Sequence, residues 1–219
     1  MLIPSSADPF ELVIFDCDGV LVDSERITNI VFAEMLNELG MDVTLEDMFA
    51  DFVGNSMAVC LGIIEARLGR AVPRDFVAEY KQRTRAAWSV QLKPVAGIED
   101  VLEEIDIPYC VASSGEHEKM RLTLGITGLL DKFEGRLFSV TEVKRGKPHA
   151  DVFLHAAERM GASPARAAVV EDTEIGIRAG VAAGMAVFGY AELSDPKRLA
   201  DAGAVVFRDM KQLPALLRR

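Results

Sequence analysis

Short apolar segments separated by polar and turn residues recur along the chain. They lie at residues 12–15, 109–112, 137–138, 167–170 and 185–188. Each segment is continuous, and this is the pattern of a strand that is buried on both faces of a parallel sheet. The intervals between the last four segments each hold one helical pattern, at about 116–124, 150–160 and 174–183. Strands that alternate with helices predict an α/β fold with a doubly wound parallel sheet.

The interval between the first two apolar segments is far longer than one helical crossover needs. Residues 24–92 within it show helical patterns and no convincing strand. Helix start signals occur in it at Ser24, Thr44, Ser56 and Pro73. The segment "LKPVAGI" at 92–98 carries the Pro and Gly of a linker. We therefore expect a small helical cap domain, 24–92, inserted into a core domain made of 1–23 and 93–219.

Composition and charge narrow the class of protein. The 219 residues are half hydrophobic, which is enough for one core with a smaller lobe, and no apolar stretch has the length of a membrane span or a signal peptide. Three cysteines without CxxC spacing fit a reducing compartment, so we expect a cytoplasmic protein. The net charge of −10 disfavours nucleic acid and anionic membranes as partners. We expect a monomer, with a weak dimer as the alternative.

Chemically active side chains follow four of the predicted strands. They are Asp16 and Asp18 after the first, Ser113 and Ser114 after the second, Lys147 after the third, and Glu171 and Asp172 after the fourth. Taken alone, each group has a structural explanation as a helix cap or a solvated surface residue. Open parallel sheets, however, bind ligands at the carboxyl ends of their strands. The joint occurrence at four strand ends therefore favours a functional site.

The residue types in this set favour phosphoryl transfer. Several carboxylates in one cleft need a cation, and oxygen ligands suit Mg²⁺, whereas the three histidines do not cluster as a zinc site would require. The Ser113 hydroxyl and the backbone N–H groups of Ser114 and Gly115 offer an anion site, to which Lys147 adds a positive charge. In such a site one aspartate can attack phosphorus and a second acid can protonate the leaving oxygen and later activate water.

The motifs "DCDGV", "ASSG", "KP" and "VVEDTEIGIRAGVAAGM", in this order, resemble those of the haloacid dehalogenase superfamily. The similarity is to the branch with a helical cap after the first strand, which includes β-phosphoglucomutase and many sugar-phosphate phosphatases. It implies a Rossmann-like core with the cap inserted into it. It also implies that Asp16 is the nucleophile, that Asp18 is the acid and base, and that Ser113 and Lys147 hold the phosphoryl group.

The resemblance further implies a magnesium site and a loop that reads the substrate. The metal would be held by the side chain of Asp16, the main-chain carbonyl of Asp18 and the side chain of Asp172, with Glu171 nearby or ligating. The cap loop "DFVGNSM" would face the active site, so that Gly54 and Asn55 contact the substrate.

Three functions, two of them enzymatic, are compatible with these motifs. The favoured one is hydrolysis of a small phosphorylated metabolite, such as a sugar or sugar-acid phosphate like 6-phosphogluconate. A β-phosphoglucomutase-type isomerase is the alternative, but such relatives carry a histidine where this chain has Thr28, and an arginine where "FVGNSM" offers none. A non-catalytic binding module is the third reading, and it is disfavoured because Asp16 and Lys147 are both present. Dehalogenases lack the acid that stands here as Asp18.

Overall fold

The computed structural model describes residues 9–52 and 55–218. Contacts between Cα atoms divide the chain into two compact units. The first, called the core here, comprises Met1–Asp23 and Lys93–Arg219. The second, called the cap, comprises Ser24–Leu92. Each unit is described by itself below.

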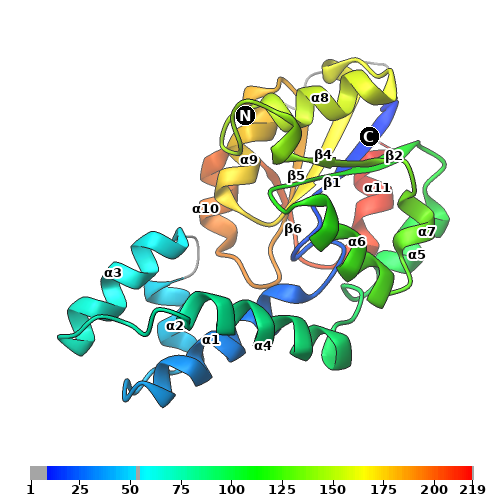
Figure 1. The fold of residues 1–219 in the computed structure, drawn as a ribbon. Helices are drawn as coiled ribbons and strands as arrows, with labels where there is room; N and C mark the ends of the chain where they lie inside the picture. The colour runs from blue at the N-terminus through cyan, green and yellow to red at the C-terminus, as the bar shows by residue number, and fades with distance from the viewer. Residues whose placement is uncertain (1–8, 53–54, 219) are drawn as a thin grey trace. The chain divides into compact units, whose positions relative to one another are not determined.

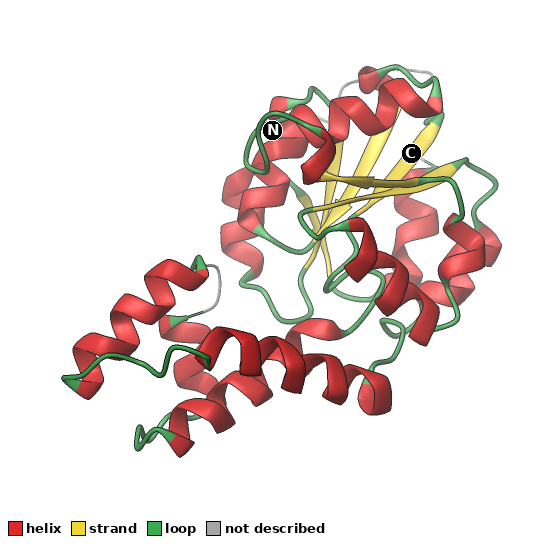
Figure 2. Ribbon diagram, viewed as in Figure 1, coloured by secondary structure: helices red, strands yellow, loops and turns green. Residues whose placement is uncertain are grey.

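A parallel sheet forms the centre of the core (Figure 2). Its strands are β1 (Leu12–Phe15), β2 (Tyr109–Ser113), β3 (Leu137–Ser139), β4 (Ala167–Glu171), β5 (Ala186–Tyr190) and β6 (Val205–Phe207). Their order in the sheet is β3-β2-β1-β4-β5-β6, with all pairs parallel. The predicted doubly wound α/β fold is confirmed, and its first strand lies in the middle of the sheet. The edge strand β6 is an addition to the sequence prediction, which placed its last strand at 185–188.

Helices connect these strands along the core (Figure 1). They are α5 (Ile98–Glu104), α6 (His117–Ile126), α7 (Leu130–Phe133), α8 (Asp151–Met160), α9 (Glu174–Ala182), α10 (Pro196–Ala202) and α11 (Leu213–Leu217). Short 3₁₀ turns occur at η1 (Val140–Glu142), η2 (Pro164–Arg166) and η3 (Met210–Gln212). No helix among residues 9–52 and 55–218 combines the length and apolar composition that a membrane span requires.

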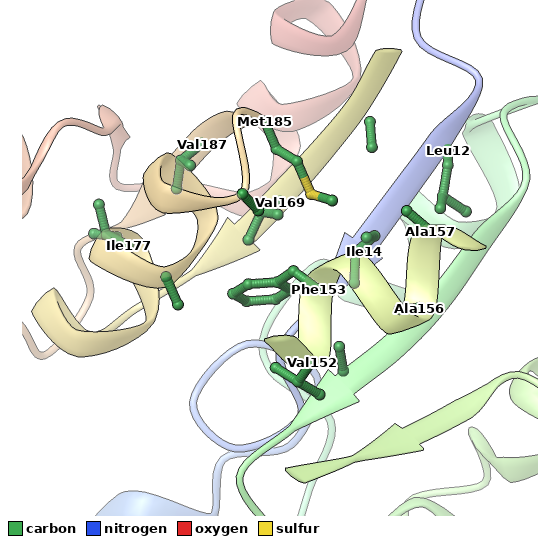
Figure 3. Close-up of a cluster of buried hydrophobic side chains, with 14 of the residues drawn as sticks. Leu12, Ile14, Val152, Phe153, Ala156, Ala157, Val169, Ile177, Met185 and Val187 are labelled. Carbon is green, nitrogen blue, oxygen red and sulfur yellow. The ribbon is translucent and has the colours of Figure 1, made fainter. Parts of the chain in front are cut away.

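Alternate residues of β1 point to opposite faces of the sheet, and both faces are buried. Leu12 and Ile14 belong to one cluster with Phe153 of α8 and with buried residues of α9 and α10 (Figure 3). On the other face the Phe15 ring meets that of Phe133 in α7, with 6.4 Å between the ring centroids. Because both faces are covered, β1 reads as an unbroken apolar run. This packing fixes the point where the strand ends and the site begins.

The cap consists of α1 (Ser24–Glu38), α2 (Leu45–Asp51), α3 (Met57–Leu68) and α4 (Phe76–Gln91). The Thr44 side chain accepts a hydrogen bond from the Asp47 N–H, and the Asp47 carboxylate accepts one from the Thr44 N–H, so the pair forms a capping box. Ser56 caps α3 in the predicted way. The fourth helix begins at Phe76 and not at Pro73, because a turn with a Phe76 N–H to Pro73 carbonyl bond comes first.

Candidate active site at the carboxyl ends of the strands

The first acidic pair follows β1 in a tight turn. The Asp16 N–H donates to the Val170 carbonyl on β4 at 2.9 Å, so the sheet ladder continues up to the acid. The chain then reverses, because the N–H groups of Leu21 and Val22 both donate to the Cys17 carbonyl, at 3.0 and 3.1 Å. Gly19 supplies the positive φ of 76° that this turn needs. The turn holds both aspartates at the edge of the sheet.

Lys147 joins the acid of β1 to the acid of β4. Its Nζ donates to Asp16 Oδ1 at 2.5 Å and to Glu171 Oε1 at 2.7 Å, and all three side chains are almost fully buried. The other Glu171 oxygen, Oε2, accepts hydrogen bonds from the Thr173 N–H and hydroxyl, at 2.9 and 2.8 Å. Both oxygens of Glu171 are therefore engaged in holding Lys147 and the start of α9. Its predicted direct contact with a metal ion stays a prediction.

Burial dominates the ionisation of this cluster. It raises the pKa of the Asp16 carboxyl to about 7, against the opposing effect of the Lys147 ammonium and with the help of the nearby Glu171 and Asp18 charges. Burial by itself would lower the pKa of Lys147, but its contacts with Asp16 and Glu171 raise it above its ordinary value. One lysine therefore does not fully compensate the acids. Any further cation at this edge would favour the ionised form of Asp16.

The predicted anion site after β2 is present as a compact hydrogen-bonded turn. The Ser113 hydroxyl oxygen is buried and accepts a hydrogen bond from the Gly115 N–H at 3.0 Å. The Ser139 hydroxyl of β3 donates to the Gly115 carbonyl at 2.8 Å, while Ser114 is exposed beside it. The Gly115 N–H that the sequence assigned to an anion thus serves here to orient Ser113.

Lys119 is a member of the site that the sequence reasoning missed. Its Nζ donates to Asp18 Oδ2 at 2.7 Å. A Cβ placed on Gly115 would lie 3.3 Å from Lys119 Cδ, so the glycine leaves room for the lysine stem. Burial lowers the pKa of Lys119, but the Asp18 carboxylate outweighs it and leaves that pKa raised. One signal was available: a lysine in the first turn of a helix opposes the helix dipole, so its presence suggests an acidic partner.

Asp172 lies against the turn that carries Asp18. A Cβ on Gly19 would come within 2.2 Å of Asp172 Oδ2, so the carboxylate packs directly on the glycine backbone. In the described residues no group of three or more His, Cys, Asp or Glu side chains is arranged to hold a metal ion by itself. Mg²⁺ is usually held by one or two carboxylates with waters and phosphate oxygens, so the oxygen donors Asp16 and Asp172 fit this ion.

The two substrate-reading residues expected in the cap have different outcomes. Gly54 lies outside the described residues. The Asn55 side chain donates through Nδ2 to the Asp51 carbonyl at 3.0 Å and lines a cavity within the cap. Its contact with a substrate stays a prediction.

Comparison with known proteins identifies the family. Residues 13–190 match the model of the haloacid dehalogenase-like hydrolases. The chain is 31% identical to the 6-phosphogluconate phosphatase of Escherichia coli (strain K12), over 94% of each chain. It is similar to a crystal structure of a haloacid dehalogenase family hydrolase from Deinococcus radiodurans with bound phosphate and sodium, with a TM-score of 0.86, 30% identity and 95% coverage of each chain.

A third similarity is to a crystal structure described as a putative beta-phosphoglucomutase from Thermotoga maritima, with a TM-score of 0.80 and 27% identity. It covers 94% of this chain and 98% of that one. The matches extend over both the core and the cap. They confirm the predicted family and the prediction that the chain is an enzyme of the hydrolase class. This chain belongs to the haloacid dehalogenase-like hydrolases.

Proposed function

We propose that the protein is a phosphatase that hydrolyses a small phosphorylated metabolite, a sugar or sugar-acid phosphate, through an aspartyl-phosphate. The observation that carries the proposal is the Lys147 ammonium bound between Asp16 and Glu171, at 2.5 and 2.7 Å. It places a buried cation directly beside a carboxylate at the edge of the sheet. Such a pair suits the attack of a carboxylate on an anionic phosphoryl group.

In the first step a carboxylate oxygen of Asp16 attacks phosphorus, and the bond from phosphorus to the ester oxygen breaks. The leaving alkoxide takes a proton from Asp18. Lys147 stabilises the negative charge that the phosphoryl oxygens gain, while Ser113 contributes its hydroxyl to the same group. The products of this step are an alcohol and a phosphorylated Asp16.

In the second step Asp18, now ionised, takes a proton from a water molecule that attacks the phosphorylated Asp16. Inorganic phosphate leaves, and both aspartates return to their starting state. Lys119 donates a hydrogen bond to Asp18 Oδ2 at 2.7 Å, which holds this carboxyl group in place for both proton transfers. The same two acids thus serve both halves of the reaction.

We further propose that Mg²⁺ is the cofactor, held by the Asp16 and Asp172 carboxylates and the Asp18 main-chain carbonyl, with Glu171 near it. When bound, the ion would neutralise charge and polarise the phosphoryl oxygens. Two features of the chain would place its ligands: Gly19 lets Asp172 approach the turn, and Lys147 keeps Asp16 in place.

The proposal is tested by phosphate release from a panel of sugar, sugar-acid, polyol and nucleotide phosphates, with Mg²⁺ and with a chelator. We expect release from sugar or sugar-acid phosphates that depends on Mg²⁺, and none with Asp16→Asn. Mass spectrometry of acid-quenched wild-type enzyme should find one phosphoryl group on the peptide that contains Asp16. Full activity of the D16N variant would refute the assignment of the nucleophile.

The mutase activity is the second candidate, favoured by the similarity to a structure described as a putative beta-phosphoglucomutase. Thr28, which stands where such relatives carry a histidine, donates its hydroxyl proton to the Ser24 carbonyl at 2.6 Å. It therefore has no proton to give to a sugar. Incubation with β-glucose 1-phosphate separates the two activities, because a phosphatase releases inorganic phosphate and a mutase forms glucose 6-phosphate.

The place of action is proposed to be the cytoplasm. All three cysteines are buried thiols, which is the state expected in a reducing compartment. Burial also raises the pKa of Cys17 well above its ordinary value, so this thiol next to Asp16 is a poor nucleophile.

A further inference from the structure

The loop that follows β2, residues 113–117, borders the acids of the site. A Cβ placed on Gly115 would lie 4.0 Å from Asp18 Oδ2, so this glycine faces the second acid. The Ser113 hydroxyl oxygen accepts a hydrogen bond from the Gly115 N–H at 3.0 Å. The position of the Ser113 hydroxyl therefore depends on the contacts that hold Gly115.

Ser139, at the end of β3, holds Gly115 through its carbonyl. The Ser139 hydroxyl donates to the Gly115 carbonyl at 2.8 Å. The same hydroxyl oxygen accepts two bonds, from the Thr141 N–H at 3.1 Å and from the Thr141 hydroxyl at 2.9 Å. A serine hydroxyl has one proton and two lone pairs, so its proton is committed to Gly115. Because Ser139 is fully buried, bulk water does not compete for this bond.

Glu142 in η1 contacts both Ser139 and the end of the loop. Its Oε2 accepts one hydrogen bond from the Ser139 N–H at 2.6 Å and another from His117 Nε2 at 2.9 Å. A carboxylate can only accept, so Nε2 carries the proton of the second bond. His117 is the first residue of α6 and the last of loop 113–117. One oxygen atom thus joins β3 to the end of this loop.

A second histidine lies on the other side of Glu142. His155 Nε2 of α8 is 3.7 Å from Glu142 Oε1, and the His155 ring meets that of Phe138 edge to face, with 5.6 Å between the centroids. Burial would raise the pKa of Glu142, but the hydrogen bonds from Ser139 and His117 outweigh it and leave that pKa lowered. Glu142 is therefore a carboxylate at neutral pH, which is the form that accepts both bonds.

A purely local role for Glu142 would be to cap η1. It does form a capping box with Ser139, and an exposed ion pair adds little to stability. Two contacts go beyond this role. Glu142 reaches His117 across 25 positions, and Ser139 reaches Gly115 across 24 positions. Both bonds end on the same loop, at its third and at its last residue.

We propose that Glu142, together with Ser139, is a positioning residue for phosphate binding, which holds loop 113–117 so that the Ser113 hydroxyl meets the phosphoryl oxygens. This role rests on the proposed function and adds a supporting layer to its phosphate site. It concerns the part of the substrate that all phosphate esters share. Loss of Glu142 should therefore weaken the binding of every ester, and of inorganic phosphate, by a similar factor.

Glu142→Met keeps the size of the side chain and removes the acceptor. We expect it to raise the KM for p-nitrophenyl phosphate and the Ki of inorganic phosphate about three- to tenfold, the effect of one misplaced hydrogen bond. Because Ser113 meets the phosphoryl oxygens before and during the reaction, kcat should change by less than about twofold. Glu142→Gln keeps an oxygen acceptor and should recover most of the loss. Glu134→Met is the matched control, since Glu134 bonds Arg121 of the same helix at 3.1 Å, beyond the loop, and should leave both constants unchanged.

Ser113→Ala separates positioning from a merely structural role. Because Glu142 is proposed to act through the Ser113 hydroxyl, adding Glu142→Met to Ser113→Ala should raise the KM no further. Independent effects would instead multiply. Ser139→Ala should raise the KM in the same range. It carries the same test if thermal unfolding shows that the Tm of Glu142→Met lies below the assay temperature.

The proposal is overturned by a rise in KM of less than about threefold in E142M, by effects of E142M and S113A that multiply, or by an E142Q variant as impaired as E142M. Failure of the proposed function is recognised separately, because the wild type would then release no phosphate from any ester. In that case calorimetric titration with inorganic phosphate and MgCl₂ decides. The Kd of phosphate must be at least about threefold higher for E142M than for the wild type, and any other result, including no binding to the wild type, overturns the proposal.

Discussion

Replacing Lys147 by Met tests how strongly the site depends on its buried cation. The substitution keeps the length of the side chain and removes the ammonium that lies 2.5 Å from Asp16 Oδ1 and 2.7 Å from Glu171 Oε1. It leaves two buried carboxylates facing each other without the charge between them. We therefore expect the K147M variant to fold with a clearly lower free energy of unfolding.

The expected loss follows from two opposing effects. At the effective dielectric constant of about 20 that suits such pairs, two unit charges about 4 Å apart attract by about 4 kcal/mol, and Lys147 makes two such contacts. The variant no longer buries a lysine charge away from water, and this offsets part of the lost attraction. Removing one partner of a buried ion pair usually lowers the free energy of unfolding by about 3–5 kcal/mol, and we expect a value in this range.

The loss should also depend on pH. In the wild type the Asp16 pKa of about 7 lies above its unfolded value, so stability from this group is present at low pH and falls as pH rises through 7. Removing Lys147 takes away the charge that lowers this pKa, so in the variant the fall continues above pH 7. Because one proton is worth about 1.4 kcal/mol per pH unit, the K147M loss should be up to about 2 kcal/mol larger at pH 8.5 than at pH 6.0.

Urea denaturation followed by far-UV circular dichroism, with a chelator present, measures this loss at the two pH values. Lys144→Met is the control, because Lys144 is an exposed residue of the same loop and its replacement should change stability by less than about 0.5 kcal/mol. The double variant K147M/E171Q should be more stable than the sum of the single changes predicts, since it also removes one of the facing charges. A K147M loss below about 1 kcal/mol, or an equal loss at both pH values, would refute the reasoning.

Further predictions concern the neighbours of this pair. Gly176→Ala should lower kcat, because its Cβ would lie 1.7 Å from Glu171 Oε1 and displace that carboxylate; the kinetics of phosphate release measure it. Asp18→Asn should slow hydrolysis of alkyl phosphates more than that of p-nitrophenyl phosphate, whose leaving group needs little protonation, and equal losses would contradict an acid role. Lys119→Met should lower kcat through the lost bond to Asp18, with Lys119→Arg restoring part of it in the same assay. With a chelator present, the wild type should lose up to about 4 kcal/mol of unfolding free energy relative to Asp16→Asn between pH 4 and pH 7 as Asp16 ionises, and urea titrations in which this difference does not change with pH would contradict the assigned pKa.

The sequence was most informative where the local structure depends on residues that are close together along the chain. The apolar run that becomes β1, and the caps at Thr44 and Ser56, each follow from local patterns and are found where they were predicted. The order of motifs also brought Asp16 and Lys147 together, although 131 positions separate them. This worked because parallel strands present their carboxyl ends at one edge of the sheet.

The features that the sequence could not supply depend on contacts between distant elements. Strand β6 was not predicted, and its place at the edge of the sheet is given by its pairing with β5. The role of Glu171 as the partner of Lys147 depends on the exact side-chain positions, since the sequence equally allowed it to face a metal ion. Lys119 reaches Asp18 across 101 positions, and Gly115 leaves the space for its stem. Each of these contacts is a property of packing that no local pattern encodes.

The charges of the site explain why its acids can lie so close together. Four acids and two lysines gather at this edge of the sheet: Asp16, Asp18, Glu171, Asp172, Lys119 and Lys147. In their ionised forms the four carboxylates exceed the two ammonium groups by two negative charges, which is the charge that one divalent cation neutralises. Burial is the main cause that raises the Asp16 pKa to about 7, and the nearby Glu171 and Asp18 charges add to it against the effect of Lys147. The proposed Mg²⁺ site should gain a negative charge as Asp16 ionises, so Mg²⁺ affinity is expected to rise with pH between 6 and 8. Isothermal titration calorimetry with MgCl₂ checks this, and an affinity that is constant over that range would show that Asp16 does not take part in binding the ion.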